Sequence, residues 1–136
     1  IFLGDRIRDR AQGLPSLRKQ GMQLHSKMRY IAAQFIPYIE EGIWAKNAAH
    51  ANAMAARLST GLGRVGVSMS YPTQANGVFP KLPVDSIPEL QEKWPFYVWN
   101  ERDGTCRLMC SFDTELTEVD GIVEAVARKL SQEARS

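Results

Sequence analysis

The chain has 136 residues, 44% of them hydrophobic and 24% charged, a composition typical of one globular domain with a buried core. The 17 basic and 15 acidic side chains give a formal net charge of +2, too small to indicate a nucleic-acid-binding protein. The charge is uneven, because residues 1–30 carry a net charge of +5. We therefore expect any anionic ligand near the N-terminal third.

The apolar segments are too short for a membrane protein. No apolar run approaches the roughly 18 residues of a membrane-spanning helix, and Ile1–Gly4 is too short for a signal peptide. The chain also opens on what resembles the end of a strand, without an initiator Met, which indicates a piece of a longer, soluble polypeptide. Cys106 and Cys110 lie about 13 Å apart along a strand-like run, too far for a disulfide, which favours a reducing cytoplasm.

Two helices are predicted in the first half of the chain, after a basic stretch broken by a glycine and by Pro15. Apolar residues in 28–39 repeat with helical period, with Ser26 as N-cap and Pro37 as an interruption. A second stripe, rich in Ala, runs through 44–62 and ends at two glycines. The alanines would let another helix approach closely.

Short strands and a short helix are predicted next. Alternating apolar residues in 65–71 indicate a half-buried strand, and a second strand covers 78–82, where Pro80 points to a sheet edge or a bulge. Residues 86–89 combine a capping Ser, a proline and a Glu at the third helical position, so a helix should begin there and end near Trp94.

A hairpin and a helix complete the chain. Strands at 96–99 and 106–112 are joined through Asp103-Gly104, a good turn signal. The last helix begins near Thr117 and has one apolar face. The order of elements predicts an α/β protein of the two-layer α+β kind, in which helices cover one side of a small, mostly antiparallel sheet.

Motifs for metal, nucleotide or nucleophilic chemistry are missing from the sequence. His25 and His50 are the only histidines, and no CxxC, HExxH, GxGxxG or Walker A pattern occurs. His50 lies in the Ala-rich stripe, where a structural role is favoured. We predict no metal site and no catalytic residue within these 136 residues.

Arg107 is the candidate binding residue. Alternation in 106–112 places Cys106, Leu108, Cys110 and Phe112 on one face and Arg107 on the other. The planar guanidinium fork suits a carboxylate, which it can hold by two parallel hydrogen bonds. The alternative is a cross-strand salt bridge with an acidic residue of the hairpin, Glu101 or Asp103.

Residues 18–29 form a second candidate. This basic, glycine-broken stretch is predicted as a loop running into a helix N-terminus, where amides and the helix dipole favour phosphate. The alternative is a solvated basic loop.

Several segments stand out together in their order along the chain. They are Arg18-Lys19 and Lys27-Met28-Arg29 around a glycine-containing loop, His50-Ala51-Asn52-Ala53, Ala75-Asn76-Gly77-Val78-Phe79, Phe96-Tyr97, Arg107-Leu108 with Ser111-Phe112, and Thr117-Glu118-Val119-Asp120. In order and in character, this series resembles the low-specificity threonine aldolases and the related phenylserine aldolases. The series covers nearly the whole chain. It departs from the glycine triplet that many members have before the Met-Arg pair, since residues 23–27 hold no glycine.

The resemblance implies a fold similar to aspartate aminotransferase, with a large domain that carries pyridoxal 5′-phosphate and a smaller C-terminal domain. Residues 1–26 would be the end of the large domain with a basic connecting loop, and residues 27–136 the small domain. The cofactor lysine would lie upstream of Ile1. Arg107 would bind the substrate carboxylate, while Lys19 and Arg29 would lie near the cofactor.

The activity implied is that of a cytoplasmic, homodimeric or homotetrameric lyase, which cleaves β-hydroxy-α-amino acids to glycine and an aldehyde. No nucleic acid and no membrane partner is expected. Two alternatives stay open: another enzyme of the same fold, either a β-eliminating lyase or an aminotransferase, and a non-catalytic interaction module.

Overall fold

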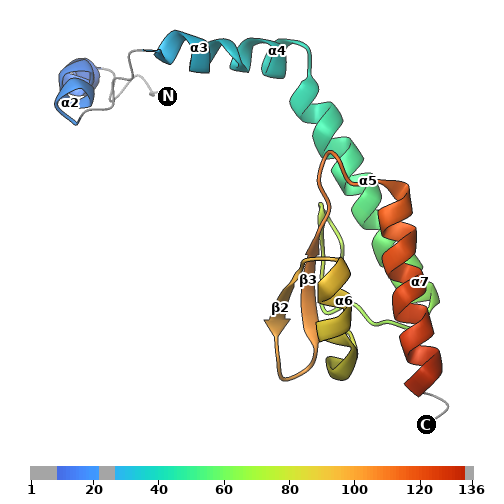
Figure 1. Cartoon of the computed structure of the whole chain (residues 1–136). Coiled ribbons are helices and arrows are strands. Elements are labelled where there is room, and N and C mark those ends of the chain that lie inside the picture. Colours follow the sequence, from blue (N-terminus) through green and yellow to red (C-terminus); the bar gives the residue numbers. More distant parts are fainter. Residues whose placement is uncertain (1–8, 22–26, 134–136) are drawn as a thin grey trace. The chain divides into compact units, whose positions relative to one another are not determined.

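The computed structural model describes residues 9–21 and 27–133, which form two compact units divided between Ile43 and Trp44 (Figure 1). The strand end predicted at residues 1–4 and the N-cap predicted at Ser26 lie outside the described residues. The functional boundary that the resemblance places between residues 26 and 27 stays a prediction.

The first unit is made of short helices. They are η1 (Asp9–Gly13), α2 (Leu14–Gln20), α3 (Met28–Ala33) and α4 (Phe35–Glu40). The helix predicted for 28–39 is interrupted at Gln34, as Pro37 requires, because a proline ring clashes with the carbonyl four residues earlier and lacks an N–H. The loop prediction for 18–29 is wrong at its start, since residues 18–20 belong to α2. Pro15 lies in the first turn of that helix, where proline is tolerated.

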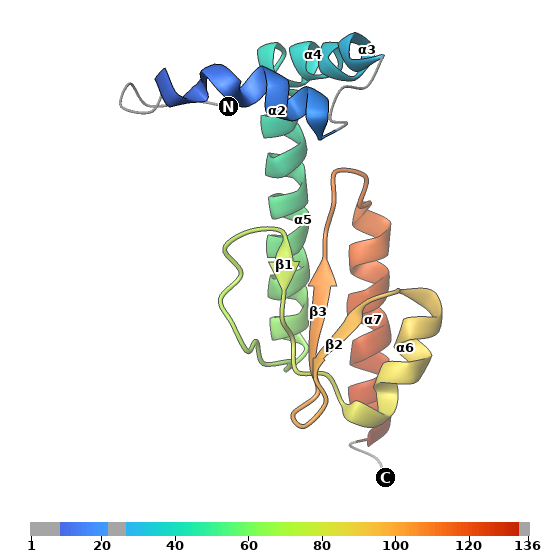
Figure 2. The ribbon, with the colours of Figure 1, turned by 90° about the vertical axis from the view of Figure 1, so that its left-hand side faces the viewer.

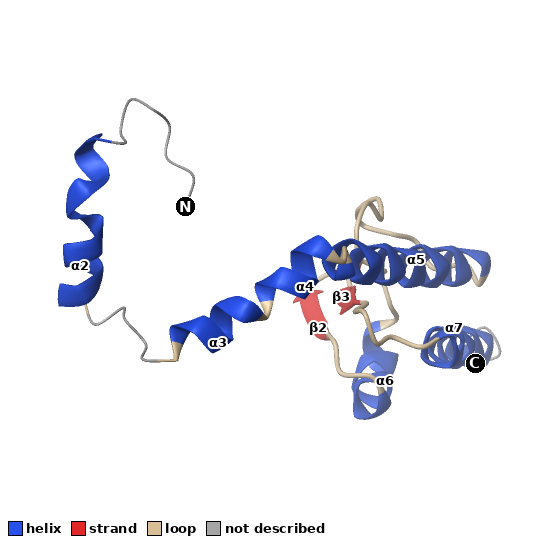
Figure 3. Cartoon of the chain, turned by 90° about the horizontal axis from the view of Figure 1, so that it is seen from above, coloured by secondary structure: helices blue, strands red, loops and turns tan. Residues whose placement is uncertain are grey.

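The second unit confirms the predicted two-layer architecture. Its three-stranded sheet has the order β1-β3-β2, formed by β1 (Gly77–Val78), β3 (Thr105–Met109) and β2 (Tyr97–Asn100), and all pairs are antiparallel. The helices α5 (Ile43–Arg64), α6 (Ile87–Lys93) and α7 (Leu116–Glu133) lie on one side of this sheet (Figures 2 and 3). A short 3₁₀ turn, η2 (Val84–Ser86), leads into α6.

The β2–β3 hairpin forms as predicted, with Gly104 at a φ of +67° in its turn. Its ladder pairs Tyr97 with Arg107 and Val98 with Cys106 and then shifts, so that Trp99 is an extra residue in β2. Such a bulge changes the direction of the side chains around it.

The strand predicted for 65–71 is wrong. Gly66 adopts a φ of +94°, outside the range of a strand, and only an isolated bridge between Met69 and Pro80 remains. The strand predicted for 78–82 is shortened to Gly77–Val78, at the edge of the sheet. Pro80 explains the shortening: its carbonyl accepts a hydrogen bond from the Cys106 N–H of β3, but it has no N–H to return.

Two predicted helix starts are correct in place, but the cap predicted at Ser86 does not form. The Ser86 hydroxyl donates to the Pro83 carbonyl and does not cap α6. α7 begins at Leu116, one residue before Thr117, and the Glu118 carboxylate accepts a hydrogen bond from the Glu115 N–H. Ser86 does not cap α6 because the Pro83 carbonyl competes for its hydroxyl.

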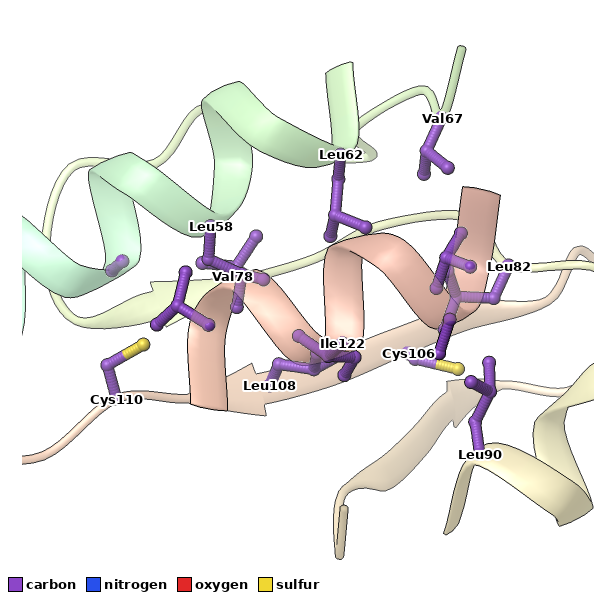
Figure 4. Packing of buried hydrophobic residues seen from close by; sticks show 14 of the residues in the cluster. Leu58, Leu62, Val67, Val78, Leu82, Leu90, Cys106, Leu108, Cys110 and Ile122 are labelled. Carbon is purple, nitrogen blue, oxygen red and sulfur yellow. The ribbon is translucent and has the colours of Figure 1, made fainter. Parts of the chain in front are cut away.

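The core of the second unit lies between the sheet and the helices (Figure 4). The largest fully buried side chains come from both layers: Leu62, Val78, Pro80, Cys106 and Val126. The apolar faces predicted for α5 and α7 supply Leu58, Leu62, Val119, Ile122 and Val126 to this core. The second unit is therefore stabilised by the helix faces that the periodicity predicts.

Candidate functional site

Strand β3 positions Arg107 on the face of the sheet that points away from the core. Cys106, Leu108 and Cys110 are 0%, 6% and 3% exposed, so the predicted alternation is confirmed. Phe112, predicted with the buried set, is exposed because β3 ends at Met109. Burial raises the pKa of the Cys106 thiol to about 11, so this side chain is a neutral core residue.

Aromatic side chains lie on one side of Arg107 and opposite it in the ladder. Tyr97 is its partner in the ladder with β2. The guanidinium carbon lies 5.8 Å from the centroid of the Trp99 ring, within the range of a cation–π contact. The Trp99 ring in turn meets Phe79 edge to face, with centroids 5.6 Å apart, and Phe79 meets Tyr71 at 5.3 Å. Arg107 thus lies at one end of an aromatic row.

The salt-bridge alternative for Arg107 does not appear in residues 9–21 and 27–133. Asp103 is instead paired with Lys81, whose Nζ lies 3.3 Å from Oδ2. Hydrogen bonds from Thr105 lower the pKa of Asp103, and the nearby Lys81 ammonium lowers it further. Within this part of the chain, the Arg107 guanidinium has no carboxylate partner, so its donors are available to an acidic ligand.

Two hollows adjoin the sheet, and neither is lined by Arg107. One, of about 420 Å³, is lined by Ser70, Tyr71, Lys81, Trp99, Asn100, Asp103 and Thr105. The other, of about 150 Å³, lies among core residues of α5, α7 and the sheet, with Trp94 and Phe96 in its wall. Arg107 therefore lies outside both hollows, and a substrate held there would need a second surface to enclose it.

Lys19 and Arg29 belong to the first unit, and their roles stay predictions. Lys19 lies in the last turn of α2, where its charge complements the carbonyl end of the helix. Arg29 lies in the first turn of α3, with its guanidinium donating to the Tyr30 hydroxyl at 3.0 Å. Both side chains are exposed, and in the described residues neither has an acidic partner. They fit an anionic group in charge and in accessibility.

The sequence did not indicate two polar contacts that join α5 to the α7 region. The Arg57 guanidinium donates to both oxygens of Asp120, at 2.8 and 2.7 Å. The Nε2 atom of His50 lies 2.9 Å from the Thr114 carbonyl oxygen, a structural contact of the kind favoured for this histidine. The partners are 63 and 64 residues apart, and no local pattern signals such pairs.

Comparisons with known proteins agree with the resemblance, although no family model matches the chain. It is 38% identical over 120 residues to a low-specificity L-threonine aldolase from Pseudomonas sp., and 39% identical over 114 residues to another from Pseudomonas aeruginosa. These matches cover 87% and 82% of the chain. The chain is a homologue of the threonine aldolases.

The match covers only part of each relative. The chain spans about a third of the two threonine aldolases, 32% and 33% of their lengths. A solved structure of a threonine aldolase from Leishmania major superposes with a TM-score of 0.54 at 38% identity, over 60% of this chain and 25% of that protein. The sheet-and-helix fold is thus shared with a threonine aldolase, as the sequence predicted.

Proposed function

We propose that the chain is the C-terminal small domain of a lyase that depends on pyridoxal 5′-phosphate and cleaves β-hydroxy-α-amino acids to glycine and an aldehyde. The observation that carries the proposal is the 38–39% identity to low-specificity L-threonine aldolases over more than four fifths of the chain. The half-buried Arg107 on the outer face of the sheet, which has no carboxylate partner in the described residues, supports it independently, because amino-acid substrates carry an α-carboxylate.

The cofactor would be held mainly outside this chain. Lys19 and Arg29 would contribute positive charge near it, in the first unit, for which their exposure suits them. When bound, pyridoxal phosphate supplies a ring that accepts the electron pair released as the substrate Cα–Cβ bond breaks. The chain itself contributes binding and orientation.

Arg107 would act as a positioning group for the substrate. Two parallel hydrogen bonds from its guanidinium to the α-carboxylate would fix the orientation of the amino acid. This orientation would determine which bond of the substrate Cα is aligned for cleavage. A guanidinium stays protonated at any physiological pH, so Arg107 neither donates nor removes a proton in the reaction. Because Arg107 lies outside both hollows, the remainder of the enzyme would enclose a substrate bound there.

The longer protein is proposed to be a cytoplasmic homodimer or homotetramer. Two free, buried cysteines suit a reducing compartment. In the described residues no helix is long and apolar enough to cross a membrane. The basic side chains of residues 18–29 are better explained by an anion bound in an active site at a subunit boundary than by exposure to solvent alone.

The test is Arg107→Lys in the longer enzyme, which keeps the charge and removes the planar fork. Loss of one charge-assisted hydrogen bond should cost roughly 1.5–3 kcal/mol, about a ten- to hundredfold fall in kcat/KM for threonine cleavage. The absorbance of the bound cofactor should barely change, because Arg107 is proposed to bind the substrate and not the cofactor.

Arg102→Lys is the matched control, since Arg102 is exposed in the hairpin turn near Arg107. It should leave kcat/KM unchanged. A purely structural Arg107 would instead give unchanged kinetics and a lower melting temperature, with at most about 1 kcal/mol lost. Transamination or β-elimination without aldol cleavage would assign the domain to another enzyme of the same fold.

A further inference from the structure

A row of aromatic rings lies on the outer face of the sheet and ends at Arg107. The proposed function of Arg107 does not use this row. The row consists of Tyr71, Phe79 and Trp99, with neighbouring centroids 5.3 and 5.6 Å apart and the planes nearly perpendicular. Tyr71 and Trp99 are 52% and 55% exposed. Large exposed rings in contact are ordered by one another, because edge-to-face pairs fix both orientation and distance.

Strand geometry explains why this row reaches Arg107. In the ladder, Tyr97 is opposite Arg107 and Trp99 is two residues further along β2, the diagonal position that a large ring can still reach across. Trp99 is the extra residue of the bulge, and a bulge turns the strand locally. The Trp99 ring is thereby set beside the guanidinium, at 5.8 Å from its carbon.

Phe79 contacts the Trp99 ring from across β3, on the same face of the sheet. Phe79 follows β1, whereas Trp99 belongs to β2, and β3 lies between these two strands. The flanking strands are about 9.6 Å apart, twice the usual strand spacing, so rings with centroids 5.6 Å apart must lean toward each other over β3. The ring pair therefore limits the directions in which the long Arg107 side chain can point.

We propose that Trp99, held by Phe79, is a positioning residue that keeps the Arg107 guanidinium ordered before a carboxylate arrives. An unrestrained arginine loses rotamer freedom on binding, and a ring that already orders it reduces that loss. The ring also attracts the cation through its negative face without competing for the N–H donors. The identity of the ligand as a carboxylate rests on the proposed function. The ordering of the Arg107 side chain by Trp99 does not depend on it.

The first experiment uses the 136-residue chain and NMR of the Arg107 side chain. Trp99→Leu should shift the Arg107 Nε–H and Cδ–H resonances, since the ring current is lost, and should increase the fast motion of Nε. Trp99→Phe should retain part of both effects. Tyr71→Leu is the matched control, because it removes one ring contact of the same row, two rings away from Arg107. Identical Arg107 spectra in the native chain and Trp99→Leu would overturn the proposal.

The second experiment measures kinetics in the longer enzyme. Trp99→Leu should raise KM for a β-hydroxy amino acid by roughly two- to fivefold with kcat little changed, while Tyr71→Leu leaves both unchanged. In an Arg107→Gln background, Trp99→Leu should have no further effect, because no cation remains to be ordered. Equal effects of Trp99→Leu in both backgrounds would overturn the positioning role. If Arg107→Gln alone leaves the kinetics unchanged, the proposed substrate-binding role of Arg107 is wrong. The NMR evidence that Trp99 orders Arg107 would be unaffected by that outcome.

Discussion

Gly104 lies in the β2–β3 turn with a φ of +67°. Residues other than glycine adopt this backbone conformation only at a cost in free energy. A Cβ added there would lie 2.3 Å from the Leu82 carbonyl oxygen, far inside van der Waals contact. That carbonyl belongs to the main chain, which cannot turn aside as a flexible side chain does. The hairpin that carries Arg107 therefore depends on this glycine.

We predict that Gly104→Ala destabilises the chain by about 3 kcal/mol or more in urea unfolding, from backbone strain together with the clash. Gly66→Ala is the control: its φ is +94°, but nothing lies within 4 Å of an added Cβ, so it should lose only about 1 kcal/mol. Equal losses in both variants would show that the Leu82 contact has no effect.

At the scale of elements, the pairing of α5 with α7 combines an apolar seam with one exposed ion pair. The Arg57–Asp120 pair is bidentate, the geometry in which a surface ion pair is most effective. The hydrogen bond from Arg57 is the main cause that lowers the pKa of Asp120 below its ordinary value of 3.8, and the charge of Arg57 adds to it. Both partners are half exposed, so salt weakens the pair.

Because folding lowers this pKa, the Asp120 contribution to stability is present above the unfolded-state pKa near 4 and is lost as pH falls through the folded-state value. We predict that the urea midpoint of the native chain falls more steeply between pH 5 and pH 2 than that of Asp120→Asn. Asp85→Asn, at an exposed aspartate, should keep the native slope. Parallel curves for the native chain and Asp120→Asn would contradict the role of the pair.

At the scale of the whole molecule, the first unit has too little core of its own. No residue of α2, α3 or α4 is buried in the described structure, and the apolar stripe of α3 and α4 is uncovered. The exposed members are Met28, Ile31, Phe35, Ile36 and Ile39. An apolar surface of this kind marks an interface, and the segments that match the two threonine aldolases make up about a third of those proteins, 32% and 33%.

We predict that residues 1–136 mixed with pyridoxal phosphate cleave no threonine and leave the cofactor spectrum unchanged. The reason is chemical: the lysine that would bind the cofactor covalently is expected upstream of Ile1. Circular dichroism on the same sample is the control for folding. Aldol cleavage by the folded chain alone would contradict the assignment as a small domain.

We also predict that the longer protein sediments as a dimer or tetramer, with the basic segment 18–29 at the subunit boundary. An amine-reactive cross-linker should join Lys19 to a neighbouring subunit, and Lys19→Arg should abolish that product. Lys46, exposed on α5, serves as the reference site. An active monomer in sedimentation would rule the arrangement out.

The sequence by itself determined what depends on local periodicity. The alternation around Arg107, the apolar faces of α5 and α7 and the glycine turn of the hairpin are properties of a few consecutive residues, whose backbone preferences persist in the fold. The family resemblance could also be recognised from the sequence, because each matching segment is a short run of consecutive residues and the segments keep their order along the chain.

Only the tertiary structure decided which groups meet across long separations. The 65–71 segment alternates like a strand, yet Gly66 leaves the strand conformation and only the Met69–Pro80 bridge forms. Arg57 meets Asp120, and Trp99 meets Arg107, because the packed layers and a bulge bring them together. Contacts of this kind depend on register and packing, which the pattern of neighbouring residues does not encode.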